Sequence, residues 1–320
     1  MLATASDAAA TCSGRPASGA RATSVPGKGI PGVGPTLPPW AKAAATQTRS
    51  AWWLLRTRGR PDGAGLRILF YHRVSDDDDP LAVSPRRFRE QMELLADAGY
   101  EAVDLASAVD LLERGLSPPS VVAINFDDGY RDVAENALPV LERLGFRATV
   151  FLPTGVIDGT ASFAWYEHQP PLLSWDEVLE LDRAGTFSFE AHTVTHPNLL
   201  LLDDAGSRHE IAQSKLDLEA RLGRPVEAFC YPAGLFGERE RRFVAESGFR
   251  AAVSCEPGVN LPGQDLLTLR RRQIDPADRR LDFRAKLGGG HDTPLPLRGL
   301  YRRVRYGEAA PPRSPVAALR

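Results

Sequence analysis

Short apolar segments alternate with amphipathic segments along most of this chain. Continuous apolar runs of this kind are typical of strands that are buried on both faces of a parallel sheet. Between them, apolar residues recur every three or four positions, which predicts helices. The expected strands lie at 66–71, 100–103, 121–125, 147–152, 187–191, 226–230, 250–254 and 266–274. An alternation of this length favours a (β/α) barrel over an open sheet.

Helix start and stop signals flank several of the amphipathic segments. Ser84 and Pro85 are typical of a helix start, and Ser174 with Glu177 forms a capping box. The helix that follows the acidic motif is expected to end at Gly145, because glycine readily adopts the left-handed conformation found after a helix. Further helices are expected at 106–113 and 208–222. These signals support an α/β architecture.

Two adjacent aspartates, Asp127 and Asp128, follow the expected strand 121–125. Two carboxylates at contact distance raise the pKa of at least one of them unless a positive charge lies between them. A bound metal cation would supply that charge. Gly129 comes next, where the backbone must turn sharply, so the acidic pair lies at a strand-to-helix crossover. In α/β folds, ligands bind at this edge of the sheet.

Other polar side chains follow other strands at the same edge. His72 and Tyr231 each come just after an expected strand, and His192 and His196 come just after another. Two histidines four residues apart can share one face of a helical turn and hold a divalent cation. Pro197 limits how far such a turn continues as helix. Together with the aspartate pair, these histidines predict a metal site.

Composition and missing motifs exclude several functional classes. The net charge of -2 and the pI near 6.3 provide no overall attraction to nucleic acid. No strand is followed by a GxGxxG, GxSxG or GxxxxGKS sequence, which excludes dinucleotide binding, a serine-hydrolase elbow and a P-loop. The spacing of Cys12, Cys230 and Cys255 matches neither a disulfide framework nor a CxxC metal site.

The two ends of the chain are expected to lie outside a catalytic domain at 65–290. Residues 1–64 lack a sustained apolar period, which predicts a disordered or loosely packed extension. Within it, 51–55 is interpreted as a short helix packing on the domain or, alternatively, as an interfacial membrane anchor. Residues 291–320 are expected to form a basic tail with a short amphipathic helix. This helix is expected to contact the barrel, a glycan or an anionic membrane. No signal peptide or transmembrane segment is recognisable, so the default location is cytoplasmic.

Six ordered motifs resemble those of a known family. Residues 66–274 are similar to the polysaccharide deacetylases with a NodB-homology domain, carbohydrate esterase family four, in the variant with an early YHR motif. The motifs are YHRV, FDDGYRD, ATVFLPTG, LSWDEV, HTVTHPNL and YPAG. Several motifs in one order are far more specific than any one of them. The resemblance implies a distorted, incomplete (β/α) barrel.

The resemblance also implies a role for each matched residue. Asp127 would be the general base, and the metal, most often Zn²⁺ in such sites, would be held by Asp128, His192 and His196. Tyr231 would supply a backbone N–H to the oxyanion. The implied reaction is the metal-dependent removal of N-acetyl, or O-acetyl, groups from a poly- or oligosaccharide.

The chain departs from the common family pattern in two places. Cys230 stands where an arginine usually orients the catalytic aspartate, and Arg271 is the expected substitute. The late histidine motif is missing, because His291 follows three glycines rather than an apolar strand, so His72 becomes the candidate general acid. Two alternatives remain: a metal-dependent amidohydrolase of a small molecule and a catalytically inactive glycan-binding homologue. The second is disfavoured because the expected chemical positions are filled.

Overall fold

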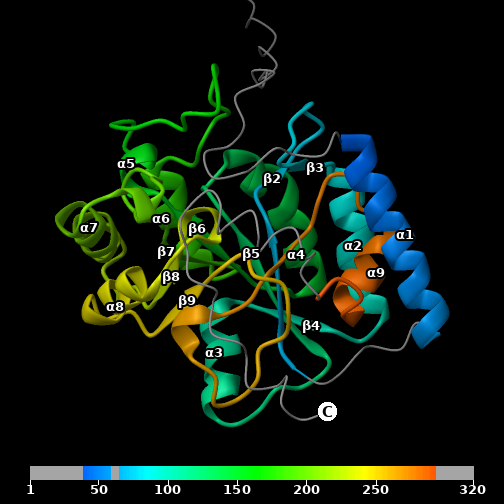
Figure 1. Ribbon diagram of the computed structural model, residues 1–320. Coiled ribbons are helices and arrows are strands. Elements are labelled where there is room, and N and C mark those ends of the chain that lie inside the picture. Colours follow the sequence, from blue (N-terminus) through cyan, green and yellow to red (C-terminus); the bar gives the residue numbers. More distant parts are fainter. Residues whose placement is uncertain (1–38, 59–64, 293–320) are drawn as a thin grey trace, which may run out of the picture.

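A curved sheet of eight strands forms the centre of the computed structural model, which describes residues 39–58 and 65–292 (Figure 1). All pairs between its named strands are parallel, in the order β10-β1-β5-β6-β7-β8-β9, with β4 paired to the first half of β5. The strands are β1 (Arg67–Tyr71), β4 (Glu101–Val103), β5 (Val121–Phe126), β6 (Ala148–Leu152), β7 (Phe187–Ala191), β8 (Ala228–Cys230), β9 (Ala251–Val253) and β10 (Arg272–Gln273). A separate pair, β2 (Arg73–Val74) and β3 (Ala82–Val83), follows β1.

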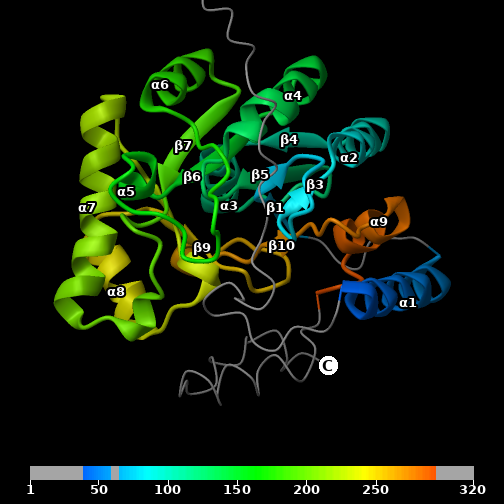
Figure 2. The ribbon, with the colours of Figure 1, turned by 90° about the horizontal axis from the view of Figure 1, so that it is seen from above.

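Helices surround this sheet, as the view from above shows (Figure 2). They are α2 (Pro85–Asp97), α3 (Leu105–Glu113), α4 (Leu138–Leu144) after the π-helical turn η1 (Val133–Ala137), α5 (Thr154–Ile157), α6 (Trp175–Ala184), α7 (Asp204–Leu222), α8 (Glu238–Glu246) and α9 (Arg280–Gly288), with 3-10 turns η2 (Leu199–Leu201), η3 (Pro232–Gly234) and η4 (Leu266–Thr268). The predicted signals are confirmed: Ser84 caps α2, Ser174 and Glu177 form the capping box of α6, and Gly145 ends α4 at a φ of 68°.

The segment after η4 closes the barrel. Leu269 forms a parallel bridge to Val253 of β9, and four residues later Gln273 of β10 pairs with Phe70 of β1. The prediction of one strand over 266–274 is wrong in part, because the Asp265 side chain accepts a hydrogen bond from Leu267 N and starts the turn η4. The segment that closes the barrel is therefore paired over only a few residues and is irregular. The predicted fold class, a distorted (β/α) barrel, is confirmed.

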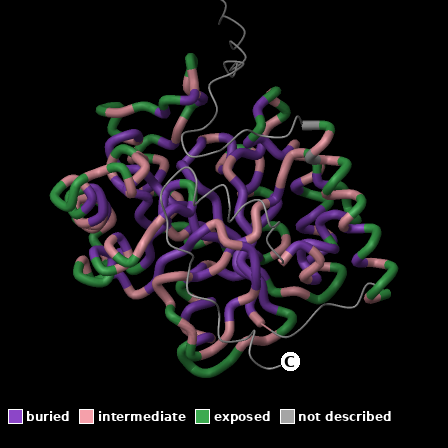
Figure 3. The backbone as a smooth tube through the Cα atoms, in the orientation of Figure 1, coloured by how far each residue is buried: buried purple, intermediate pink, exposed green. Residues whose placement is uncertain are grey.

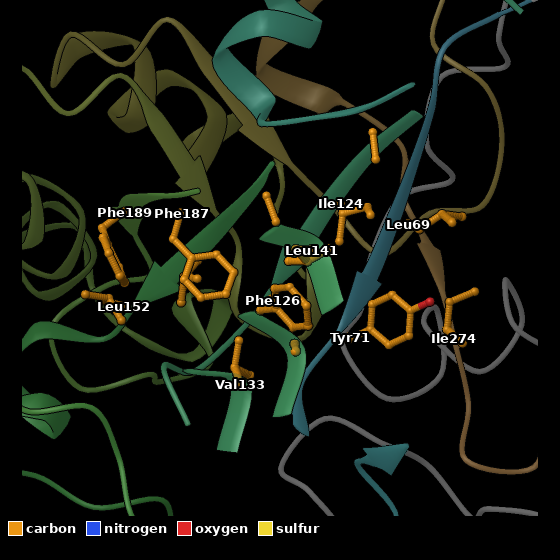
Figure 4. Packing of buried hydrophobic residues seen from close by; sticks show 14 of the residues in the cluster. Leu69, Tyr71, Ile124, Phe126, Val133, Leu141, Leu152, Phe187, Phe189 and Ile274 are labelled. Carbon is orange, nitrogen blue, oxygen red and sulfur yellow. The ribbon is translucent and has the colours of Figure 1, made fainter. Parts of the chain in front are cut away.

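Alternation along β5 separates two apolar clusters. Val122, Ile124 and Phe126 belong to the large cluster between the sheet and the outer helices, and Val121 and Ala123 belong to a smaller cluster on the other face. Figure 4 shows the large cluster around Phe126, and Figure 3 shows that burial is concentrated in the strands. Burial of each such side chain stabilises the fold by about 1.5–3 kcal/mol. Both faces of β5 are thereby fixed, so its carboxyl end has one defined position.

Helix α1 (Pro39–Thr57) lies against α9 on the outside of the barrel (Figure 1). Trp53 is buried there, and a Cβ atom added to Gly288 or Gly290 would lie within 2.5 Å of its ring. Part of the range 1–64, expected to be disordered or loosely packed, is thus an ordered helix with a buried tryptophan. The expected amphipathic helix of the C-terminal tail falls outside the described residues. In the described ranges, no helix is both long enough and apolar enough to cross a membrane.

Candidate active site

A tight turn at the end of β5 holds the two aspartates. Asp128 and Gly129 both adopt left-handed φ angles, of 74° and 70°. A Cβ atom at Gly129 would lie 2.5 Å from Leu152 Cδ2, so only glycine fits this close approach. Both carboxylates are almost completely buried, Asp127 at 2% and Asp128 at 1% exposure. The turn therefore places two acidic groups inside the protein at the carboxyl edge of the sheet.

The two histidines after β7 lie on either side of the Asp128 carboxylate. His192 Nε2 is 3.6 Å from Asp128 Oδ1, and His196 Nε2 is 3.5 Å from the same oxygen. The expected helical turn between them is absent: Thr193 and His196 have φ angles of 68° and 56°, and the segment is an irregular loop. The predicted grouping of Asp128, His192 and His196 is present, although a loop and not a helix produces it.

The electrostatics of this group fit a cation. Burial, together with the charge of Asp127, raises the pKa of Asp128 well above its usual value. Burial lowers the pKa of His192 to about 4 and that of His196 well below its usual value. Among the described residues, Asp128 Oδ1 has no hydrogen-bond partner. Neutral imidazoles and an uncompensated carboxylate oxygen thus face one another, which is the donor set that Zn²⁺ prefers.

The distances between the three candidate ligand atoms also fit a bound metal ion. Two ligand atoms about 2.1 Å from a tetrahedral metal are roughly 3.4 Å apart, close to the distances from Asp128 Oδ1 to the two imidazole nitrogens. Asp127, His192 and Cys230 also lie close together. That second group is poorly suited to hold a metal ion. His192 Nδ1 is hydrogen-bonded to Cys230 O at 2.8 Å, and the Arg271 guanidinium donates a hydrogen bond to the Asp127 carboxylate. The Cys230 carbonyl thereby fixes the imidazole orientation that directs Nε2 to Asp128.

Arg271 holds Asp127 with two hydrogen bonds. Its Nη1 donates to Oδ1 at 2.7 Å and its Nη2 to Oδ2 at 2.8 Å. Arg271 comes from the segment that closes the barrel and is itself buried, with its guanidinium 4.2 Å from the ring centre of Phe70. The expected contact of Arg271 with Asp127 is therefore present. Although burial favours the neutral acid, Arg271 lowers the pKa of Asp127 to about 2, so Asp127 is a carboxylate at neutral pH.

His72 lies at the same edge as Asp127. Burial lowers the pKa of His72, and the charge of Asp127 opposes this effect, so the two side chains influence each other. The next residue, Arg73, donates to Asp132 at 2.8 Å and to Asp79 at 3.0 Å. Since Asp132 belongs to the same motif as Asp127, these bonds tie the YHR motif to the acidic turn.

His291 lies elsewhere. It is buried between α1 and α9, and its Nε2 is 3.1 Å from Ser50 Oγ. The positive charges that lower its pKa, after burial, belong to Lys286, Arg272 and Arg49.

The backbone of Tyr231 differs from what the resemblance implies. Its N–H donates to Val253 O at 3.2 Å, as a continuation of the pairing between β8 and β9. The donor expected for an oxyanion is thus engaged in the sheet in this structure. The side chain points toward the helical layer, where its ring stacks on Phe236 at 4.3 Å and its hydroxyl donates to Leu267 O. We therefore assign Tyr231 no oxyanion contact here.

Sequence reasoning missed an aromatic wall beside the ligands. The rings of Phe163 and Trp165 lie 5.6 and 5.2 Å from the His196 ring, and both come from the loop between α5 and α6. Tyr130 is fully buried, and its ring lies 5.8 Å from that of Phe163. The place of Tyr130 in the motif FDDGYRD could have indicated from the sequence that it lies near the site. The loop that carries the other two rings has no pattern that points to the histidines. This wall limits access of water to the ligands from one side.

Comparison with known proteins gives one consistent result. The family described as polysaccharide deacetylase matches residues 115–252. YxkH of Bacillus subtilis, whose name places it among the polysaccharide deacetylases, is 30% identical over 214 residues, which are 67% of this chain and 72% of YxkH. The poly-beta-1,6-N-acetyl-D-glucosamine N-deacetylase of Staphylococcus aureus is 24% identical over 206 residues, 62% of this chain and 69% of that protein.

A solved structure agrees with this. The deacetylase PplD of Streptococcus pyogenes, in complex with acetate, superimposes with a TM-score of 0.59 at 25% identity, over 68% of this chain and 94% of that one.

Proposed function

This chain belongs to the polysaccharide deacetylase family, hydrolases that act on carbon–nitrogen bonds, and we propose that it removes N-acetyl groups from a polysaccharide that contains N-acetylglucosamine. The observation that carries the proposal is the cluster of Asp128, His192 and His196 beside the buried Asp127. The substrate class is supported by the Staphylococcus aureus relative, whose name specifies such a polymer.

We propose Asp128, His192 and His196 as the ligands of one divalent cation, Zn²⁺, because a set of two imidazoles and one carboxylate suits that ion. When bound, the cation polarises the acetyl carbonyl and lowers the pKa of a water molecule toward ~7. The protein contributes the orientation of the ligands. Cys230 O holds the His192 ring through a hydrogen bond to Nδ1.

Asp127 is the proposed general base. It is ionised at any pH near neutrality, and the two hydrogen bonds from Arg271 fix its carboxylate in one orientation. Because its pKa is low, Asp127 is a weak base on its own. It can therefore take a proton only from a water molecule whose own pKa has been lowered. Arg271 acts through Asp127 and is a positioning residue.

His72 is the proposed general acid. Hydrolysis of an amide releases an amine, which leaves only when its nitrogen receives a proton. A histidine whose pKa is lowered by burial is a stronger acid in its protonated form, and the negative charge of Asp127 helps it to hold that proton. Asp127 would take one proton from water and His72 would give one to the leaving nitrogen, so the protein's net charge is unchanged across C–N cleavage.

Two variants test this assignment. His192→Ala is expected to lose the bound Zn²⁺, measured by elemental analysis of purified protein. Asp127→Asn is expected to keep both metal and fold while acetate release from N-acetylglucosamine oligomers falls by ~10²- to 10⁴-fold. Full metal occupancy in His192→Ala would overturn the ligand set, and normal turnover by Asp127→Asn would exclude this base. Turnover of small acetamides in preference to oligomers would contradict the polysaccharide substrate.

A further inference from the structure

We infer that Glu210, on helix α7, is a positioning residue for the metal site, because it holds the loop that joins the two histidine ligands. Glu210 lies outside the six family motifs and is 8% exposed. The inference rests on the proposed function only in taking His192 and His196 as metal ligands.

One carboxylate makes three hydrogen bonds to this loop. Glu210 Oε2 accepts from Val194 N and from Thr195 N, both at 2.9 Å. Its Oε1 accepts from the Thr195 hydroxyl at 2.7 Å. Charge-assisted hydrogen bonds of this kind are about twice as strong as neutral ones. Glu210 thus binds the middle of the loop with both of its oxygens.

The remaining backbone groups of the loop are bound from other directions. Thr193 O and Val194 O accept from Thr154 N and Gly155 N of α5, at 3.1 and 2.8 Å. His196 N donates to Thr193 Oγ1 at 3.0 Å. Among these contacts, a single substitution at Glu210 can remove three. Without Glu210, Val194 N and Thr195 N would lose the acceptors that they have in this structure.

The loop needs such a clamp because its conformation is unfavourable. Thr193 and His196 both have positive φ angles, which non-glycine residues rarely adopt and which disfavour a β-branched residue most. Conformations of this kind persist only where the surroundings determine them. If the bonds of Glu210 are removed, the loop is free to relax, and relaxation of His196 moves its Nε2 away from the Asp128 oxygen that lies 3.5 Å from it. Loss of Glu210 should therefore weaken metal binding before it unfolds the barrel.

The helix offers a matched control. Glu219 lies on the same helix α7, and its Oε1 accepts from Val226 N at 3.0 Å, in the loop that leads to β8. Glu219→Met makes the same chemical change on the same helix, but at the end that holds no candidate ligand loop. A metal affinity that is lost only in Glu210→Met would therefore be due to the ligand loop and not to a general effect on α7.

The experiment measures metal binding directly. Zn²⁺ affinity is determined for the full chain by competition with a chromophoric chelator, and the absorption spectrum of the Co²⁺-loaded protein reports the ligand geometry. We expect Glu210→Met, which removes all three acceptors, to bind Zn²⁺ about 10- to 100-fold more weakly, with an altered Co²⁺ spectrum, because supporting residues commonly have effects of this size. Glu219→Met should bind as the wild type does. If Glu210→Met does not fold, Thr195→Val, which removes one of the three bonds, should show a smaller loss in the same direction.

The outcomes separate this inference from the proposed function. Wild-type affinity in Glu210→Met, or equal weakening by Glu210→Met and Glu219→Met, would overturn the positioning role. In that case loss of metal by His192→Ala would leave the proposed function intact. Retention of metal by both His192→Ala and Glu210→Met would overturn the ligand set, and the positioning role with it.

Discussion

His72 follows β1 at the carboxyl edge of the sheet, whereas His291 follows α9 and contacts Ser50 of α1. Burial lowers the pKa of both imidazoles. The charges around them differ in balance. Asp127, Asp79 and Asp275 raise the pKa of His72 and Arg271 lowers it, whereas Lys286, Arg272 and Arg49 lower that of His291 to about 3 against a single opposing charge, Asp275.

This difference supports the proposal that His72, and not His291, is the proton donor. A proton donor near neutral pH needs negative groups that help it to hold a proton before donation. His72 has such groups, and it lies close enough to His192 and His196 to affect their pKa values. His291 is a neutral group that fills the interface of α1 with α9 and pairs with Ser50. The position of a histidine in the chain therefore matters less than the charges that the fold places around it.

The strongest test of this comparison is the pair His72→Ala and His291→Ala. We expect His72→Ala to slow acetate release from N-acetylglucosamine oligomers by ~10²- to 10⁴-fold, because the leaving amine loses its proton donor. Zn²⁺ content, measured on the same samples, should be unchanged. His291→Ala should change the rate by less than about twofold at a temperature where both variants are folded. The reverse result would exchange the two roles.

The ion pair of Arg271 with Asp127, at the catalytic edge of the sheet, should also affect the free energy of unfolding. Arg271→Met leaves the buried Asp127 carboxylate without its cation, which we expect to lower the free energy of unfolding by about 3–5 kcal/mol. Urea denaturation would measure this. The double variant Arg271→Met with Asp127→Asn should lose less than the single variant, since the unpaired charge is removed as well. Equal losses in both would show that the pair contributes by packing alone.

A substitution near His291 should change the stability of the protein through lost packing and leave its activity unchanged. Trp53 is 3% exposed and lies against Gly288 and Gly290 of the α9 end. Trp53→Ala should lower the free energy of unfolding by about 3 kcal/mol, because a large buried ring is removed. Its acetate release rate, measured well below the unfolding temperature, should match the wild type. A loss of activity in the folded variant would mean that α1 supports the catalytic edge.

The smallest expected effect is a pH dependence of stability due to His291. Its pKa is about 3 in the folded protein, below the usual value of 6.5, so the unfolded chain binds more protons between these values. The contribution of His291 is therefore fully present above about pH 6.5 and is lost as the pH falls toward 3. Between pH 7 and 5, the wild type should lose about 2 kcal/mol more stability than His291→Gln, which does not titrate. Parallel curves for the two proteins would contradict the low pKa.

Local sequence determined most of the secondary structure and the approximate place of the site. The apolar runs predicted the strands because a parallel sheet buries both faces of its strands, and Gly145 predicted the end of α4 because the αL conformation suits glycine. Since the carboxyl ends of parallel strands share one edge, the order of the motifs alone placed His72, Asp127 and His192 there. These predictions needed only the properties of neighbouring residues.

Only the tertiary structure decided how these residues meet. The loop from His192 to His196 is not helical because α5 and Glu210, which belong to other elements of the fold, bind its backbone groups. Arg271 reaches Asp127 because an irregular segment closes the barrel, and Tyr231 N–H is occupied because β9 pairs with β8. Contacts between distant segments depend on how the whole chain packs. For that reason, the residue types of the site are visible in the sequence, whereas their partners and orientations are not.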